Sequence, residues 1–502
     1  MRHEGVLFSC LTVLYLLANC LLLCRPALGQ ALTPGPNSQS SSSSYSSGVS
    51  GNSSQSNSPG AVLVQGPFSG SVPEGKATAE VLPLSFKDAV DRGLRNNLGI
   101  LLQSDSVLIA RGERWNELSA LLPHLNAAVT ESAEQIDLAA LGFRFKAPGM
   151  ANVVGPIGIF QTGAYLTQSL FDYHAIERKR GASYNEKAVQ YSLKNARELV
   201  VLAVGNSYLV ALAGGARVTT AQADVVTAQS LYDKAADQQR AGVIPAIDAL
   251  RAHVELQSRQ QQLIVSRNDY AKEKLTLARV IGLPPGQEFA LTTEAPYEPL
   301  ATLSLEEDLQ RAYASRPDYL AGAQGVRSAE EFRRATTAEY YPTLDMAGNY
   351  GAAGIRPGSS HGVFAVGATL NIPIFAGGKT HADVLEAEAS LRQSRQQLED
   401  LRGQIDYEVR SARLDLTAAA DQVEVARSSV DLANQTLEQA RDRFAAGVTD
   451  NLEVVQAQEA VASANESYIS SLYAHNLAKI SLAKAVGFAE EGVRQYLENR
   501  GK

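Results

Sequence analysis

The strongest pattern in the sequence is a seven-residue repeat of apolar positions along one predicted helix, from Lys379 to Ala446. One column of every seventh residue is large and apolar, and a second column three positions further on is small: Val409, Leu416, Val423, Val430, Leu437 and Phe444, then Ala412, Ala419, Ala426, Ala433, Ala440 and Gly447. A sustained heptad of this kind is typical of a coiled-coil seam. At about 1.5 Å per residue, the helix would be about 100 Å long.

A second long helix, predicted from about His174 to Arg240, carries the same two columns. The large or medium positions are Val204, Ala211, Val218, Val225 and Tyr232, and the small ones are Ser207, Gly214, Ala221, Ala228, Ala235 and Gly242. Glycine inside a helix normally weakens it. Gly214 falls in the small column, so close packing against a neighbouring helix explains it.

The order of predicted elements occurs twice along the chain. Landmarks recur 219 residues apart before the predicted strands and 205 apart after them: Leu84-Ser85-Phe86 with Leu303-Ser304-Leu305, Asn97-Leu98 with Arg316-Pro317, Ala241-Gly242-Val243 with Ala446-Gly447-Val448, and Gly282 with Gly487. Each copy reads helix, helix, strand, strand, long helix, turn, returning helix, and we interpret this order as an internal tandem duplication. The strands would then lie at one end of the long helices and the glycine turns at the other.

Strand-like alternation between the helices points to a membrane. The best strand places Phe364, Val366, Ala368, Leu370, Ile372 and Ile374 on one face, with Gly367, Thr369 and Asn371 on the other. This is long enough for a tilted strand to cross a bilayer. Shorter alternation covers 125–132 and 164–171. Beyond the first 24 residues no apolar run approaches helix-spanning length, so a membrane part would be a closed barrel.

One chain supplies four such strands, whereas membrane barrels begin at about eight. We therefore expect the barrel to be shared between chains. The alternative is a small amphipathic sheet that caps a periplasmic coiled-coil scaffold or adaptor without a pore.

The N-terminus has the features of an export signal. Arg2 precedes an apolar run from Val6 to Cys24, and Ala27-Leu28-Gly29 has the small-x-small form of a cleavage site, so residues 1–29 are predicted to be a signal peptide. All three cysteines lie in this segment, and the mature chain would contain none. A retained membrane anchor and a lipid-modified Cys20 remain alternatives.

Composition and charge exclude several function classes. Removal of Arg2, Glu4 and Arg25 with the signal changes the formal charge from −8 to −9, and no basic block of the kind that binds nucleic acid occurs. Gly378-Lys379-Thr380 resembles the end of a phosphate-binding loop, but Pro373 stands where the pattern needs glycine. The scattered histidines form no metal motif, and His475 aligns with the large column of the last helix as a packed residue. We therefore predict no enzyme, no cofactor and no metal.

From these features the chain resembles the TolC-like outer-membrane efflux family over nearly everything from Leu84 to Gly487. The similarity is carried by the strand-to-helix edges at Phe171 and Phe375, the segment Arg443–Gln458 and the ending Ala483–Gly487. The resemblance implies a homotrimer with one shared 12-stranded transmembrane barrel in the outer membrane of a Gram-negative bacterium, and an α-barrel tunnel through the periplasm. It also implies docking of the helical tip on a periplasmic adaptor (membrane fusion) protein and an inner-membrane pump.

The family's tip acids map onto specific residues here. By position Asp248 and Glu453 match acidic sites near the tunnel entrance, beside the turns at Gly242 and Gly447. Gln456 replaces a second pore-facing acid. Phe444 and Thr449 stand where a better-studied member has a tyrosine and an arginine that bond across neighbouring helices, and neither is expected to form those bonds. The alternative for Asp248 and Glu453 is a solvated carboxylate at a helix start.

The predicted architecture is therefore mainly α, with long antiparallel coiled-coil helices and four strands per chain. Its function would be an exit duct of a tripartite efflux or type I secretion system. The predicted segments are: 1–29 signal peptide, 30–83 disordered Ser/Gly/Pro-rich segment, 84–286 first repeat, 287–302 linker, 303–488 second repeat and 489–502 C-terminal tail.

Overall fold

The computed structural model describes residues 67–137, 153–292, 304–446, 448–449 and 451–492. The helices are α2 (Phe86–Asn96), α3 (Leu98–Ser119), α4 (Tyr173–Arg240), α5 (Ala246–Ile281), α6 (Leu305–Ser315), α7 (Pro317–Ala338), α8 (Lys379–Ala445) and α9 (Asn451–Ala485). The strands are β1 (Leu82–Leu84), β2 (His124–Asp137), β3 (Val153–Phe171), β4 (Phe289–Leu291), β5 (Thr343–Gly354) and β6 (His361–Asn371), and the 3-10 turns are η1 (Pro67–Ser69) and η2 (Pro357–Ser359).

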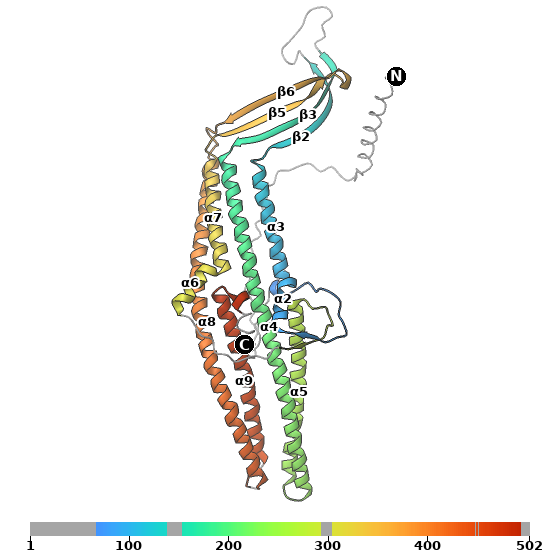
Figure 1. Ribbon diagram of the computed structural model, residues 1–502, viewed down its shortest axis with the longest axis vertical. Coiled ribbons are helices and arrows are strands. Elements are labelled where there is room, and N and C mark those ends of the chain that lie inside the picture. Colours follow the sequence, from blue (N-terminus) through green and yellow to red (C-terminus); the bar gives the residue numbers. More distant parts are fainter. Residues whose placement is uncertain (1–66, 138–152, 293–303, 447, 450, 493–502) are drawn as a thin grey trace, which may run out of the picture. The chain divides into compact units, whose positions relative to one another are not determined.

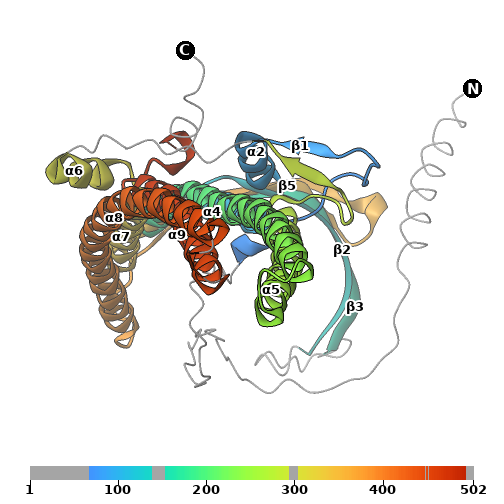
Figure 2. The same cartoon turned by 90° about the horizontal axis from the view of Figure 1, so that it is seen from below.

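The element order of the first half, α2-α3-β2-β3-α4-α5, recurs as α6-α7-β5-β6-α8-α9 (Figure 1). Both halves begin with the same capping box, in which Ser85 pairs with Asp88 and Ser304 with Glu307. These caps satisfy the first free N–H groups of α2 and α6 and fix where each helix starts. In the half of the helical layer next to the sheet, α4 contacts α3 and α7, and α7 contacts α8. In the other half, which ends in the α4–α5 and α8–α9 turns, the helices α5, α4, α9 and α8 lie side by side (Figure 2).

The predicted heptad columns of α8 form a packed seam. Most of their members are buried, and those in the part near the turn pack against Val454, Ala457 and Val461 of α9. Nearer the middle of α8, Ala412, Leu416 and Ala419 pack with Ala478 and Leu482. The prediction of a coiled-coil seam is therefore confirmed at both levels of the helix pair.

Gly214 is explained by a close contact, as predicted. A side chain at this position would overlap the carboxylate of Glu273 on α5 and lie 3.3 Å from the Tyr270 ring. Burial raises the pKa of Glu273 to about 7, and Glu273 Oε2 has no hydrogen-bond partner among the described residues. The glycine thus makes room for a carboxyl group that packs directly on the α4 backbone.

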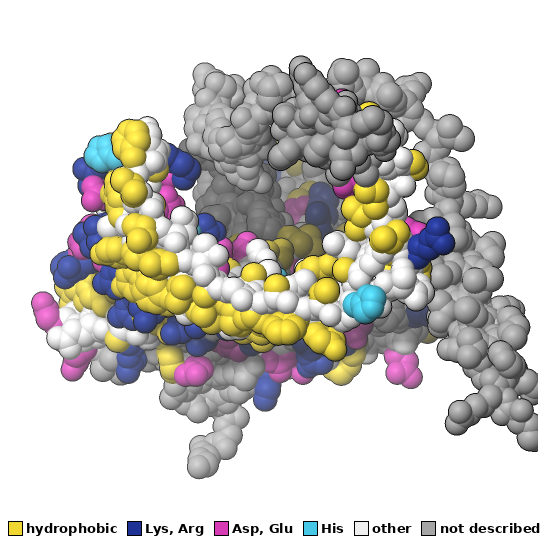
Figure 3. Space-filling model, turned by 90° about the horizontal axis from the view of Figure 1, so that it is seen from above, with side chains coloured by type: hydrophobic (Ala, Val, Ile, Leu, Met, Phe, Trp, Pro, Cys, Tyr) yellow, Lys and Arg dark blue, Asp and Glu magenta, His cyan; other side chains and the backbone are white. Residues whose placement is uncertain are grey.

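The second sheet is antiparallel in the order β2-β3-β5-β6, so β2 and β6 are its edges. Cα partners lie directly across from each other and share a face. The register therefore sets Leu125, Leu166, Tyr350, Phe364, Val366 and Leu370 on one face, and Asn126, Tyr165, Thr167, Asn349 and Thr369 on the other. Figure 3 shows hydrophobic side chains gathered along the convex side of this sheet.

The strands differ from the predicted ones in length. β2 and β3 are longer than the predicted 125–132 and 164–171. The added part of β3 contains Gly158 and Gly163, which weaken the alternation, and the added part of β2, residues 133–137, is mostly polar. β6 ends at Asn371, so the expectation that Ile372 and Ile374 continue its apolar face is wrong. Pro373 has no N–H for the ladder, and the chain leaves the strand before it.

Residues 67–83 and 289–291 contain structure that the sequence pattern did not predict. β1 pairs in parallel with β4. β1 begins in the predicted disordered segment and ends at Leu84, the first residue of the predicted first repeat, and β4 lies in the predicted linker. Phe68 of η1 packs against Gly99 of α3, and Val72 N donates to Asn96 O at 2.9 Å. Three-residue strands show no periodicity, so a pattern search misses them.

The α4 helix corrects one expectation about the membrane. It contains an 18-residue window with a mean hydropathy of 1.8, so a helix long and apolar enough to span a bilayer is present after all. Of this window 56% is buried inside the protein. The buried core around it includes Val200, Val204, Tyr208 and Leu209, which pack with α2, α5 and α9. The apolar run is therefore accounted for by packing inside the helical layer.

The residue between the first two helices differs between the two halves, and so do its contacts. In the first half Asn97 is buried, donates from Nδ2 to Phe68 O at 2.7 Å and caps α3 through Gly99 N. In the second half Arg316 takes this place, 1% exposed, and binds Asp318, Glu408 and Ala485 O.

Arg316 belongs to a buried charge network. Its Nη1 lies 2.7 Å from Glu408 Oε2, and Lys484 Nζ lies 2.9 Å from the same oxygen. Burial would raise the pKa of Glu408, but Lys484 and Arg316 outweigh it and hold the pKa at about 2. The network joins the start of α7, the middle of α8 and the end of α9.

Candidate gate at the hairpin turns and the junction beneath the sheet

The first predicted tip is the turn between α4 and α5. Gly242 adopts a φ of +73°, a left-handed conformation that glycine allows at no steric cost. Asp248 lies in the first turn of α5, where it is 8% exposed, and its Oδ1 lies 3.4 Å from Arg251 Nη1. Asp248 is therefore largely enclosed and faces a cation of its own helix, which is not the arrangement of a freely solvated carboxylate.

The second predicted tip lies between α8 and α9. Glu453 Oε1 forms an ion pair with Arg443 Nη1 at 3.1 Å, and Thr449 Oγ1 donates a hydrogen bond to Glu453 Oε2. The carboxylate thus ties the end of α8 to the start of α9. Gln456 is exposed, and Gly447 lies outside the described residues.

Phe444 and Thr449 behave differently from each other. Phe444 is buried among Leu437, Ala440 and Val454 and makes no polar link, as expected. Thr449, in contrast, does form a polar contact, with Glu453 of its own hairpin. The sequence analysis missed the role of Arg443 and Thr449, although an arginine and a threonine that flank a turn before a helix-start glutamate were a usable signal.

The two hairpin ends are packed unequally. The α8–α9 end buries Leu437, Phe444, Val454 and Val461, and Leu231 of α4 packs against it. Next to the α4–α5 turn the apolar cluster consists of the buried small residues Ala235, Ala249 and Ala252, with Tyr232 stacked on His253 at 4.8 Å. Larger apolar side chains remove more apolar area from water and so stabilise the packing more. The α4–α5 end, which has mostly alanines next to its turn, is therefore the less stable of the two.

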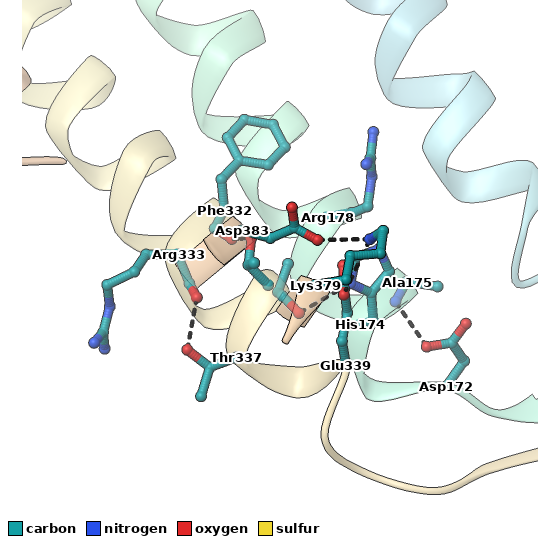
Figure 4. A network of polar contacts seen from close by, with 12 residues as sticks. Asp172, His174, Ala175, Arg178, Phe332, Arg333, Thr337, Glu339, Lys379 and Asp383 are labelled. Carbon is teal, nitrogen blue, oxygen red and sulfur yellow. Dashed lines mark hydrogen bonds and ion pairs between the residues drawn. The ribbon is translucent and has the colours of Figure 1, made fainter. Parts of the chain in front are cut away.

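A second polar cluster lies where the sheet meets the helices (Figure 4). His174 Nδ1 is 2.9 Å from Ala335 O, and Glu339 lies 3.8 Å from His174 and 3.7 Å from Lys379 Nζ. Lys379 also pairs with Asp383 at 2.5 Å. The cluster therefore joins the sheet-proximal ends of α4, α7 and α8.

These contacts also argue against a phosphate-binding loop at Gly378-Lys379-Thr380. Gly378 is the left-handed N-cap of α8, and the Lys379 ammonium is engaged by two carboxylates. Among the described residues, no group of three or more His, Cys, Asp or Glu side chains is placed to hold a metal ion. His475 is fully buried, and burial lowers its pKa to about 4, which confirms it as a packed histidine.

The fold and these sites define the class of protein. The sequence matches the family described as outer membrane efflux protein over residues 117–283 and 309–488, more than two thirds of the chain, and the protein belongs to this family. The family consists of transport channels and not of enzymes. Its members lie in the outer membrane of Gram-negative bacteria with a large periplasmic helical part, and the same place is assigned to this protein.

Individual members of the family share low sequence identity with this chain. OprJ, an outer membrane protein of Pseudomonas aeruginosa, is 24% identical over 448 residues, which cover 84% of this chain and 88% of OprJ. AprF, the alkaline protease secretion protein of the same species, is 24% identical over 341 residues, 65% of this chain and 69% of AprF. The crystal structure of the CmeC outer membrane channel of Campylobacter jejuni superposes with a TM-score of 0.70 at 16% identity, over 89% of this chain and 97% of CmeC.

Proposed function

We propose that the protein is the exit duct of a tripartite efflux or type I secretion system. In this proposal it is a passive homotrimeric channel, and it receives cargo from an inner-membrane pump through a periplasmic adaptor. The observation that carries the proposal is the four-stranded sheet, which has one apolar face, one polar face and two open edges.

The open edges argue for a shared barrel. In β2 and β6 one side of each strand has no neighbouring strand within the part of the chain that the structure describes. Unpaired backbone groups are very costly in the hydrocarbon core of a membrane, so spanning sheets are closed. Three copies would supply twelve strands, above the minimum of about eight, with the apolar face towards lipid and the polar face towards the lumen. The repeated element order supports an origin by tandem duplication.

The helices offer matching lateral surfaces. On α5 the exposed apolar residues include Ile247, Leu250, Val254, Ile264 and Leu275, and on α8 they include Tyr407, Leu414, Val425 and Leu432. α5 packs on α4, and α8 packs on α9 and α7, so these surfaces lie at opposite ends of the helix row. Different surfaces that meet head to tail generate a ring when the rotation closes.

The strand-to-helix junctions support a membrane boundary just beyond the polar cluster of Figure 4. Phe171, Tyr340, Tyr341 and Phe375 are all at least 49% exposed there. Aromatic side chains gather at the level of lipid head groups in membrane proteins. In the proposed arrangement the sheet therefore lies in the bilayer and the helices lie in the periplasm.

The hairpin turns would form the gate. Asp248 and Glu453 would contribute negative charge near the entrance, and the turn at Gly242, together with the position Gly447, would move outward when an adaptor engages. The α4–α5 end would yield first because its contacts are alanine-based. Energy would come from the pump, since the proposed duct supplies only a path and a gate.

Single-channel recording of the purified protein in planar bilayers tests the duct. We expect discrete conductance steps, and a coiled-coil scaffold without a pore would give none. The ring is tested separately by replacing Leu414 and Leu432 with lysine and measuring mass by analytical ultracentrifugation in detergent. Lysine at exposed Glu424 is the matched control on another face of α8. A trimer unaffected by the leucine substitutions would remove α8 from the interface.

A further inference from the structure

One buried and one mostly buried carboxyl group lie close together where α4 packs on α7. Glu177 is 0% exposed, and the side chain of Glu331 is only 12% exposed. Each of the two carboxyl groups shifts the pKa of the other. The helices leave little room around them, because a side chain at Gly181 would lie 3.1 Å from the Phe332 ring and Ser328 Oγ donates to Gly181 O at 2.9 Å.

Cations flank the carboxyl pair without fully neutralising it. Arg180 Nη1 lies 2.6 Å from Glu177 Oε1, and Arg334 Nη1 lies 3.1 Å from Glu331 Oε1. Both arginine side chains are more than half exposed, so water screens their charges. The Tyr173 hydroxyl faces Glu177 as well. These groups, from α4 and α7, make up the charged and titratable surroundings that act on the pair.

One oxygen of the pair lacks a donor. Glu177 Oε2 is inaccessible to water and has no hydrogen-bond partner among the residues that the structure describes. An enclosed polar atom left in this state destabilises the folded protein, and a charged one does so more strongly. A metal ion fits poorly because two guanidinium groups already surround the site. A proton between the carboxyl groups would supply a donor and remove one of two adjacent negative charges.

The electrostatics agree with a shared proton. Burial raises the pKa of Glu331, and the neighbouring Glu177 raises it further. Burial also acts on Glu177, but the contacts with Glu331, Tyr173, Arg180 and Arg334 outweigh it and lower its pKa. Two interacting carboxyl groups that diverge in this way lose their protons in two separate steps, and one proton belongs to the pair between them.

We propose that Glu177 and Glu331 form a proton-binding site, which holds one shared proton in the folded protein and couples pH to the packing of α4 on α7 beneath the sheet. Loss of that proton leaves two carboxylates side by side in the helix contact and weakens it. The effect reaches α8 through the neighbouring Glu339–Lys379 pair (Figure 4). The inference does not depend on the proposed duct function.

Infrared difference spectroscopy of the purified protein tests the site directly. Wild type minus Glu331→Gln should show one protonated-carboxyl stretching band, which disappears as the pH is raised. The difference isolates this pair from other protonated acids such as Glu198 and Glu273. Absence of such a band at every pH from 5 to 9 would overturn the proposal. If Glu331→Gln fails to fold, Glu177→Gln serves in the same measurement.

Thermal unfolding gives the second readout. The folded pKa of Glu331 lies above its ordinary value, so wild type should lose stability as the pH rises from about 4.5 through the folded value. Glu331→Gln, which keeps an amide donor for Glu177, should not show this loss. Glu330→Gln is the matched control, because Glu330 is the adjacent residue and pairs instead with Arg395 of α8. Identical pH profiles for the two variants would contradict the site.

Discussion

Replacement of Glu198 by glutamine should stabilise the protein at alkaline pH and have little effect at pH 5. Glu198 of α4 is 8% exposed, and its Oε2 accepts a hydrogen bond from Ala489 N at 3.4 Å. Burial, together with the nearby Glu490 and Asp318, raises the pKa of Glu198 to about 7, against the weaker opposing effects of Ala489 N–H and Lys484. Ionisation of this carboxyl group therefore destabilises the folded state.

The sign and size follow from linkage. Between pH 4.5 and about 7 the folded state keeps a proton that the unfolded state has released, so stability falls across this window and the full penalty is present above it. The difference between the two pKa values corresponds to an upper bound of roughly 3 kcal/mol. For a chain of this length, that is a rise of about 2–3 °C in Tm.

The assay is thermal unfolding of wild type and Glu198→Gln in detergent at pH 5 and pH 8.5. We expect the Tm of the variant to exceed that of wild type at pH 8.5. At pH 5 the two Tm values should be equal, because glutamine keeps the acceptor for Ala489 N–H. Glu424→Gln, at an exposed position of α8, controls for loss of a negative charge. A difference between Glu198→Gln and wild type that stays constant with pH would show that Glu198 is ionised at an ordinary pKa and would refute the reasoning.

Three further predictions concern the tip, the seam and the buried network. Glu453→Gln should reduce the cation preference of the channel in bilayer recordings, and unchanged selectivity would remove this residue from the entrance. Ala426→Leu should cost about 1–3 kcal/mol by overpacking the seam and lower the yield of assembled oligomer on native gels, whereas Ala420→Leu, half-exposed and outside the columns, should not. Arg316→Met should destabilise the protein by about 3–5 kcal/mol in urea unfolding, with partial recovery on adding Glu408→Gln.

The long elements were predictable because their signal is repeated many times. The α8 seam contributes a marker every seven residues, and the predicted helix 379–446 ends within one residue of the observed Ala445. The predicted start at His174 is likewise one residue from Tyr173. Repetition averages out single exceptions such as Gly214, so helix type and length could be read from the sequence.

Short and non-local features escaped prediction for physical reasons. β1 and β4 are each three residues long and depend on pairing with each other across 200 residues of chain. β6 ends before Pro373. The prediction of its apolar face considered only every second residue, Ile372 and Ile374 among them, and so did not take the proline between them into account. At the tip, the roles of Arg443 and Thr449 depend on how α8 and α9 approach each other. The carboxyl pair Glu177–Glu331 arises only when α4 meets α7.

The apolar window of α4 has a consequence for how the polypeptide reaches its destination. An outer-membrane protein first crosses the inner membrane as an unfolded thread, and the secretion machinery offers each segment a chance to partition sideways into lipid. A stretch of 18 residues with a mean hydropathy of 1.8 is long and apolar enough to be a candidate for retention there. Gly205, Asn206 and Ser207 interrupt its aliphatic run, and replacing them with leucine would retain the nascent chain in the inner membrane before its packing partners in α5 and α9 had emerged.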